Sequence, residues 1–366
     1  MKKLLEISPF PAGAQSDGFF AALASAVLPC LGIKEESPYW CSPKGAYCTG
    51  CGGCGDRSNL QKHQEMMYHT LLAASGAAFT FDYPEDDSVA YHTMPGIPLG
   101  WRWEEPFVAD LADFAGLSYE RYTAQSVSEM LDAIRKSVDS GYTALVADHG
   151  QWKEASEWAR CWNVVCGYTD DGLLVMRPGG EIAEERGGTH EDWIVFTGRA
   201  RRKQTYRDIL EKICAVLSDQ SHDRLEQLID ESLSDVTPEN AEKLAHMTMG
   251  INGVPIESRW HAAEAFCSCD NLLSGMTEDE ALKSRLCELF FKRYIANDSG
   301  ETHGTGWKIW GALGVGPATG YMPTDESYAL IQRPEVQAEM KRLFQIVFAN
   351  DRAVADGIRA ALANLS

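Results

Sequence analysis

The chain lacks the excess of positive charge that nucleic acids and anionic membranes attract. Its 366 residues carry 33 Lys and Arg against 53 Asp and Glu, which gives a formal net charge of −20. A protein that binds phosphate backbones needs a basic surface, so we expect no nucleic-acid partner. One basic cluster stands out, and we interpret it as a solvated linker between two domains: Arg199, Arg201, Arg202 and Lys203.

The sequence also lacks an apolar run of the roughly 20 residues that a membrane span needs. Its basic start is interrupted by Glu6 and Pro9 before a signal-peptide core could form. We therefore predict a cytoplasmic protein without a membrane partner. The 11 cysteines are an odd number, and without an export signal thiols are more often buried, metal-bound or catalytic than paired in disulfides.

The pattern of predicted secondary structure changes near residue 200. Before this point short apolar runs alternate with helical segments and turns, and after it nearly every segment is typical of a helix. The chain is also too long for one ordinary core. We predict an α+β protein with two domains. An antiparallel-sheet domain with an N-terminal helix spans residues 1–200, and an all-helical domain spans residues 201–366.

Local patterns place the elements of the first domain. A nearly unbroken apolar segment predicts a buried helix over residues 17–31. Strands at 162–168 and 173–176 are joined by an Asp-Asp-Gly turn that is typical of a hairpin. A capping box at Ser126–Glu129 begins another helix, and alternating polarity over residues 78–83 predicts a strand.

The second domain is predicted to be a helical bundle. A capping box at Thr277–Glu280 indicates a long helix. Arg259–His261 are expected to begin another and to serve in packing, and the alternative is that they face the first domain. Six glycines between residues 304 and 320 predict a loop. Two further helices are expected at 333–349 and 351–364.

One segment carries a resemblance to a known family. Asn163–Pro178, NVVCGYTDDGLLVMRP, resembles the central hairpin of papain-like and bacteriocin-processing cysteine peptidases. With the early helix and the segment Leu71–Phe79, the chain resembles more closely the N-terminal domain of the butirosin-biosynthesis acyltransferase family, which is a papain-like relative. The resemblance covers about residues 8–200 well and the helical region loosely, and it implies a papain-like fold for the first domain.

The same resemblance implies three catalytic positions. The family has a cysteine at the N-terminus of the first helix, a histidine at the start of the hairpin, and an Asp or Asn after its second strand. These positions fall here on Gly18 (or Phe19), Cys161 and Arg177, so we assign no catalytic residue. Our first hypothesis is a pseudo-enzyme whose relict cleft binds a peptide, an acyl chain or a small metabolite.

Several residues are candidates to line that cleft. Two tryptophans on one loop could form aromatic walls around a ligand or could simply cover the sheet. Ser16 could be a nucleophile or could cap the helix. Cys161 could be a nucleophile or simply a small apolar residue in a strand. The second hypothesis is a cysteine-dependent amide hydrolase or acyltransferase with a relocated nucleophile. The candidates are Gln15, Ser16, Trp101, Trp103, His149 and Trp162.

A cysteine-rich loop over residues 40–55 is the most unusual local feature. Cys41, Cys48, Cys51 and Cys54 follow the spacing Cys-x6-Cys-x2-Cys-x2-Cys among several glycines. Four thiolates at short spacing can hold zinc or an iron–sulfur cluster. A disulfide, a dithiol or free thiols are the alternatives. The third hypothesis is therefore a metal- or redox-responsive binding protein, and the sequence indicates no oligomeric state.

Overall fold

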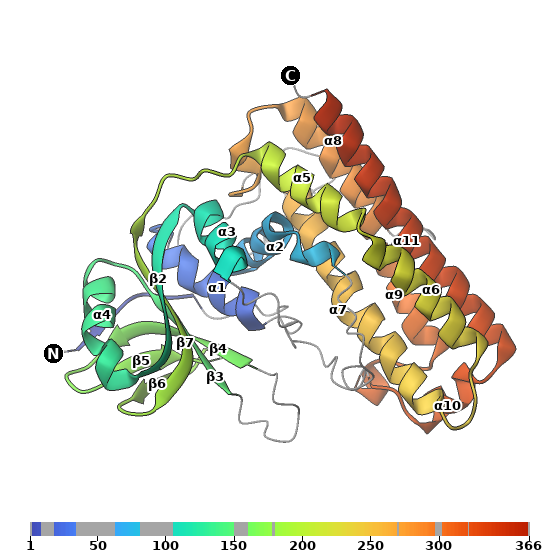
Figure 1. Ribbon diagram of the computed structural model, residues 1–366, viewed down its shortest axis with the longest axis horizontal. Helices are drawn as coiled ribbons and strands as arrows, with labels where there is room; N and C mark the ends of the chain where they lie inside the picture. Colours follow the sequence, from blue (N-terminus) through green and yellow to red (C-terminus); the bar gives the residue numbers. More distant parts are fainter. Residues whose placement is uncertain are drawn as a thin grey trace.

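The computed structural model has an antiparallel sheet in the first half of the chain and a bundle of helices in the second (Figure 1). This is the mixed α+β architecture predicted from the sequence. The structure describes residues 2–8, 18–33, 63–80, 105–149, 160–177, 180–268, 271–296, 302–320 and 322–364.

The strands of the described residues form one antiparallel sheet in the order β2-β7-β3-β4-β5-β6, with β1 paired to the end of β4. The predicted hairpin is confirmed as β4 and β5. Strands β1, β2 and β6 were not predicted from the sequence. The strands are β1 (Lys3–Leu4), β2 (Leu117–Ser126), β3 (Ala144–His149), β4 (Arg160–Tyr168), β5 (Leu173–Met176), β6 (Ile182–Glu185) and β7 (Thr189–Arg199).

The two faces of the sheet pack against different helices. Successive side chains of a strand point to opposite faces, so Val146 packs with α4 (Val127–Asp139) while its neighbour Leu145 packs with α1 (Gly18–Cys30). The predicted buried helix over 17–31 is thus confirmed as α1. The predicted capping box is also present, because Ser126 accepts a hydrogen bond from the backbone of Glu129 and the Glu129 carboxylate accepts one in return.

A predicted strand is absent where the structure describes it. Residues Ala77–Phe79 form a 3₁₀ turn that follows α2 (His63–Ser75). Gly76 adopts a left-handed φ of 76°, which turns the chain sharply, and the Ala77 N–H donates to Ser75 Oγ at 3.0 Å. All three residues of the turn are buried. This part of the predicted strand is therefore packed between helices, and residues 81–83 of that prediction lie outside the described residues. The chain continues, after residues that are not described, into α3 (Glu105–Ala115).

The second half is helical, as predicted, with different boundaries. The predicted helix from Thr277 begins at Glu280, because Asp279 is the residue that caps it. It continues into a π-helical turn at Phe291–Ile295. Arg259–His261 lie inside a helix and do not begin one. The helices are α5 (Tyr206–Leu217), α6 (Gln220–Ser234), α7 (Ala241–Cys267), α8 (Glu280–Phe290), α9 (Thr302–Ala312), α10 (Asp325–Ile331) and α11 (Pro334–Ala363).

Two predictions for this half are wrong. The first part of the glycine-rich segment is helix α9, where Gly306 packs so closely on α7 that a Cβ would lie 2.9 Å from Ile256 Cγ2. The two helices expected at 333–349 and 351–364 are the single helix α11. The residues taken for a break are buried partners of other elements, since Asn350 donates to Thr302 Oγ1 at 3.2 Å and Asp351 pairs with Arg259.

The hydrophobic core continues across residue 200. One buried cluster contains side chains of α1 and α2 from the first half and of α5, α7, α8 and α11 from the second. Helix α2 lies between the sheet and α7 (Figure 1). The predicted boundary at residue 200 therefore separates a strand-rich part of the chain from a helical part. The buried side chains of the two parts nevertheless form one core.

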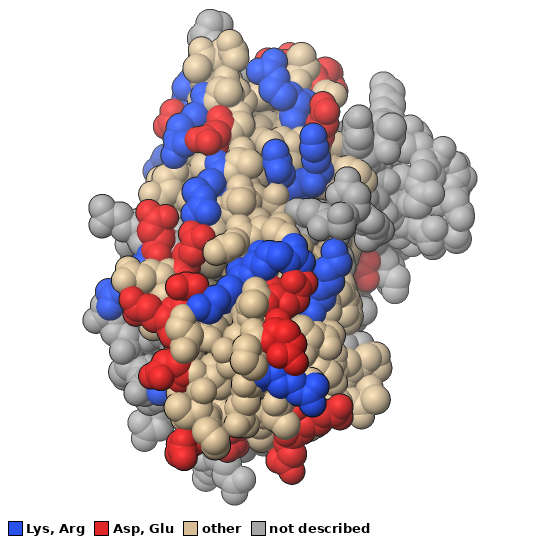
Figure 2. Space-filling model, turned by 90° about the vertical axis from the view of Figure 1, so that its right-hand side faces the viewer, with Lys and Arg blue, Asp and Glu red and all other residues tan. Residues whose placement is uncertain are grey.

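Among the described residues, the face of the helical half seen in Figure 2 shows no concentration of one charge. Lys and Arg are interspersed there with Asp and Glu. Among the described residues, no helix combines the length and apolarity needed to cross a bilayer.

Candidate functional site

The N-terminus of α1 lies against the start of β4. The Phe19 and Trp162 rings meet edge to face with their centroids 5.2 Å apart, and each residue is only 1% exposed. Gly18 precedes Phe19 as the first residue of α1, and Cys161 precedes Trp162 in β4. Two of the three positions implied by the papain-like resemblance therefore lie close to the same ring contact.

The neighbouring strand β3 brings a further candidate to this region. His149 is the last residue of β3 and is paired with Arg160, while Cys161 is paired with Asp148. Trp162 is thus both a candidate of the sequence analysis and a buried residue beside α1. The chemistry available at Gly18 is limited to its backbone, because glycine has no side chain that could attack a carbonyl carbon.

Arg177 follows the last residue of β5 and is engaged in an ion pair. Val164 of β4 pairs with Met176 of β5, and Arg177 is the next residue after Met176. Its guanidinium donates to Glu185 at 3.2 Å, and His190 Nε2 lies 3.2 Å from the other carboxylate oxygen. The contact with His190, and then that with Arg177, hold the pKa of Glu185 below its usual range. These contacts link the end of β5 to β6 and β7.

Eight predicted site residues lie outside the described part of the chain. They include every proposed metal ligand, so zinc, iron–sulfur and redox chemistry at the cysteine-rich loop stay predictions. Elsewhere, in the part that the structure describes, no three His, Cys, Asp or Glu side chains gather as metal ligands. The eight are Gln15, Ser16, Cys41, Cys48, Cys51, Cys54, Trp101 and Trp103.

Two of the described thiols, Cys30 and Cys166, are poor nucleophiles. Burial raises the pKa of Cys166 to about 11 and also raises the pKa of Cys30. A thiol reacts as its thiolate, so both are expected to be inert at neutral pH. Cys287 differs, because it is only partly buried and a hydrogen bond from Cys267 lowers its pKa. It lies in α8, away from the sheet.

A buried histidine pair joins the two halves of the chain. His69 Nε2 on α2 lies 2.8 Å from His261 Nδ1 on α7, and Glu257 approaches His261 Nε2 at 3.6 Å. Burial, and then the charge on His261, lower the pKa of His69 well below its ordinary value. His69 is therefore neutral in the folded protein. The sequence gives no indication of this pair, because its members are 192 residues apart.

A buried ion pair lies nearby in the same interface. Arg259 is fully buried and donates to both carboxylate oxygens of Asp351, with Nη2 2.7 Å from Oδ2. It also donates to the carbonyls of Ala78 and Phe79 in the first half. Tyr294 completes the network by donating to Asp351 at 2.8 Å. The sequence left open whether Arg259 serves in packing at a helix start or faces the first domain, and the structure shows that it joins the halves.

Function has to be inferred from these residues and their geometry. No protein-family model matches the chain, and no curated protein matches its sequence. The resemblance to papain-like proteins therefore depends on the sequence motifs alone.

Proposed function

We propose that this chain is a catalytically inactive relative of papain-like cysteine hydrolases that binds its ligand beside the N-terminus of α1. The observation that carries the proposal is that Gly18 opens α1, while the next residue, Phe19, packs on Trp162 of β4. In the papain-like pattern the nucleophilic cysteine begins that helix. Here the equivalent residue has no side chain.

The arrangement supports binding better than bond cleavage. The first N–H groups of a helix have no partner within the helix, and its dipole places partial positive charge there. In a hydrolase this charge lowers the pKa of a cysteine thiol. With glycine in that place, the same N–H groups are suited to a carbonyl or carboxylate oxygen of a ligand. A peptide, an acyl chain or a small metabolite offers such an oxygen.

The other two positions also lack the family's chemistry. Cys161 stands where a histidine would act as the base, and Arg177, in place of the orienting acid, is paired with Glu185. Loss of one group could be compensated by a neighbour. The simultaneous loss of nucleophile, base and orienting acid favours a binding protein.

Thiol labelling tests this proposal. Wild-type protein is treated with iodoacetamide at neutral pH, and the modified cysteines are identified by peptide mass mapping. We expect Cys161 to react no faster than a free cysteine peptide. A hyper-reactive Cys161 would contradict the proposal and would support the alternative of a hydrolase or acyltransferase with a relocated nucleophile.

An introduced cysteine provides the matched comparison. Gly18→Cys restores a thiol to the start of α1, where the helix dipole favours the thiolate. It should be alkylated faster than the thiol of Gln227→Cys, which replaces an exposed residue in the middle of α6. Equal rates at the two positions would show that the start of α1 does not activate a thiol.

A further inference from the structure

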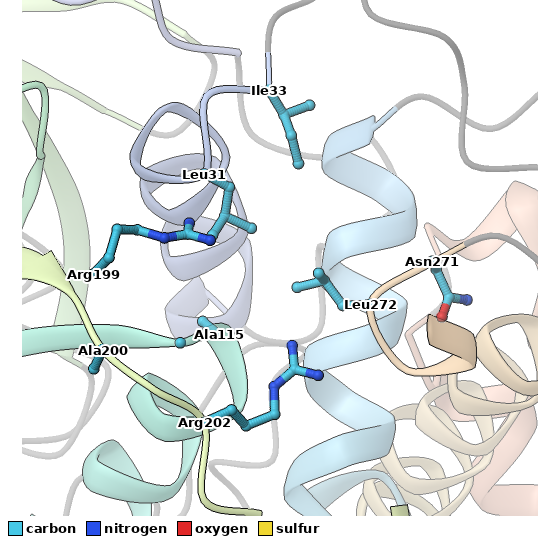
Figure 3. A pocket seen from close by; sticks show the side chains of 9 residues that line it. Leu31, Ile33, Ala115, Arg199, Ala200, Arg202, Asn271 and Leu272 are labelled. Carbon is cyan, nitrogen blue, oxygen red and sulfur yellow. The ribbon is translucent and has the colours of Figure 1, made fainter. Parts of the chain in front are cut away.

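A pocket lies at the other end of α1. It has a volume of about 450 Å³ and is lined by Leu31 and Ile33 after α1, by Arg199 and Arg202 around the end of β7, and by Leu272 from the helical half (Figure 3). The 13 residues of α1 separate it from Gly18 by about 20 Å at 1.5 Å per residue. The pocket is therefore distinct from the site of the proposed function.

Both arginines are held in place by the C-terminal ends of helices. Arg199 Nη1 donates to the carbonyl of Cys30, the last residue of α1, at 3.4 Å. Arg202 Nε donates to the carbonyl of Phe114 in α3 at 2.7 Å and its guanidinium lies over the Phe114 ring. Each contact uses one N–H and fixes the side chain. The remaining N–H groups of a guanidinium are available to a ligand.

The two cations have no carboxylate partner among the described residues. Asp113 is the acid whose charge acts on Arg202, but its oxygens accept the backbone N–H groups of Lys203 and Gln204 at 2.8 to 3.1 Å. Burial, together with the charge of Arg199, lowers the pKa of Arg202. Two like charges that line one pocket repel each other, and an anion between them would relieve that repulsion.

The remaining walls of the pocket are apolar or already satisfied. Leu31, Ile33 and Leu272 offer hydrocarbon surface. Asn271 also lines the pocket, but its amide donates to the Ala265 carbonyl at 2.8 Å and accepts from the Ser274 N–H at 2.8 Å. Polar recognition is therefore left to the arginines. The volume lies in the range of small-molecule sites, about 300–1,000 Å³.

We propose that this pocket binds a small amphipathic anion, with a carboxylate or phosphate head between Arg199 and Arg202 and an apolar body against Leu31, Ile33 and Leu272. Guanidinium groups match the geometry of both kinds of oxyanion. The ligand would bridge the sheet half and the helical half, because Leu272 belongs to the second and Leu31 to the first. Binding therefore stabilises the junction between them.

Four probes test the chemistry of the site on the full chain. Octanoate, octyl phosphate, octanol and inorganic phosphate are compared by isothermal titration calorimetry and by the shift in melting temperature. Octanoate or octyl phosphate should bind and raise the melting temperature, and the tighter of the two identifies the head group. Octanol lacks the charge and should bind at least about tenfold more weakly, given the strength of hydrogen bonds to charged groups. Equal binding of octanol would overturn the proposal, as would the absence of binding by both anions.

Single substitutions locate the site. Arg199→Gln and Arg202→Gln should each weaken binding of the preferred anion about tenfold. Arg201→Gln is the matched control, because Arg201 is exposed and lies between them in sequence without lining the pocket. An equal loss in the control would place the ligand elsewhere. If an arginine variant is less stable than the wild type, the comparison of octanoate or octyl phosphate with octanol on the wild-type protein still tests whether the pocket prefers a charged ligand. Gly18→Cys protein alkylated at position 18 should bind the anion normally, so the two proposals can fail separately.

Discussion

Several buried side chains in this protein are held in place by partners that are distant in sequence. Arg259 could be recognised from sequence as a residue of a helical segment, but its contacts with Asp351, Ala78 and Phe79 depend on how three elements meet. The same holds for His69 and His261. Gly18 is the opposite case, because the expectation that a nucleophile is missing there rests on a resemblance in the local sequence alone.

The buried ion pair gives a prediction about stability. Asp351→Asn or Arg259→Met leaves one buried charge without its partner, which should reduce the free energy of unfolding by about 3–5 kcal/mol. Urea unfolding measures the loss. The exposed pair Arg342–Glu339 is the control, and Arg342→Met should cost less than about 1 kcal/mol. A loss of similar size at both pairs would contradict the role of Arg259 as the buried link between the halves.

The histidine pair gives a prediction about pH. The pKa of His69 is lowered in the folded protein, so as the pH falls below about 6.5 the unfolded chain gains a proton there that the folded protein does not. The free energy of unfolding should therefore fall with pH in that range. His69→Gln removes this contribution and should give a shallower slope between pH 6.5 and pH 5 in urea unfolding. Identical slopes for the two proteins would show that His69 does not remain neutral in the fold.

At the scale of elements, local chemistry predicted part of the fold. The β4–β5 hairpin and the capping box before α4 are set by a few adjacent residues, and both are confirmed. The glycine-rich segment that became α9 was predicted wrongly. Glycine weakens a helix locally, but here a glycine allows α9 to approach α7. A contact between two helices cannot be predicted from the sequence of one of them alone.

Helix α9 contains a test of this explanation. Gly306→Ala adds a methyl group that would lie 2.9 Å from Ile256 Cγ2, so it should destabilise the protein although alanine favours helices. Gly311→Ala, in the same helix, has no atom within 4 Å of the added Cβ and should stabilise by about 0.5–1 kcal/mol. Thermal unfolding of both variants measures the difference. Stabilisation by both would show that the α7–α9 contact does not require glycine.

At the scale of the whole molecule, the sequence predicted a strand-rich first half and a helical second half. It did not predict that the two halves share one hydrophobic core. The first half is rich in strands and the second in helices, as the change in sequence texture indicates. The shared core and the Arg199–Arg202 pocket were not foreseen, because each depends on segments that meet across residue 200. The arginines had been interpreted as solvated linker residues, whereas Arg202 is partly buried and caps α3.

The shared core predicts that the halves depend on each other. A fragment of residues 1–200 would expose the face of α2 that packs on α7. It should therefore lack the cooperative urea transition of the full chain, with poorly dispersed amide signals in its NMR spectrum. A single cooperative transition for the fragment would show that the first half is an independent domain.

The central proposal is that the starts of α1 and β4 form a papain-like site from which the catalytic groups are missing. It is tested most directly by the pH dependence of iodoacetamide alkylation at position 18. Gly18→Cys is compared with the double variant Gly18→Cys/Trp162→His, because Trp162 lies on the α1 side of the sheet and contacts Phe19. If position 162 faces the start of α1, the introduced histidine keeps the thiolate ionised in acid, and the lower limb of the rate profile should move down by about 2 pH units. Superimposable profiles for the single and double variants would contradict the account.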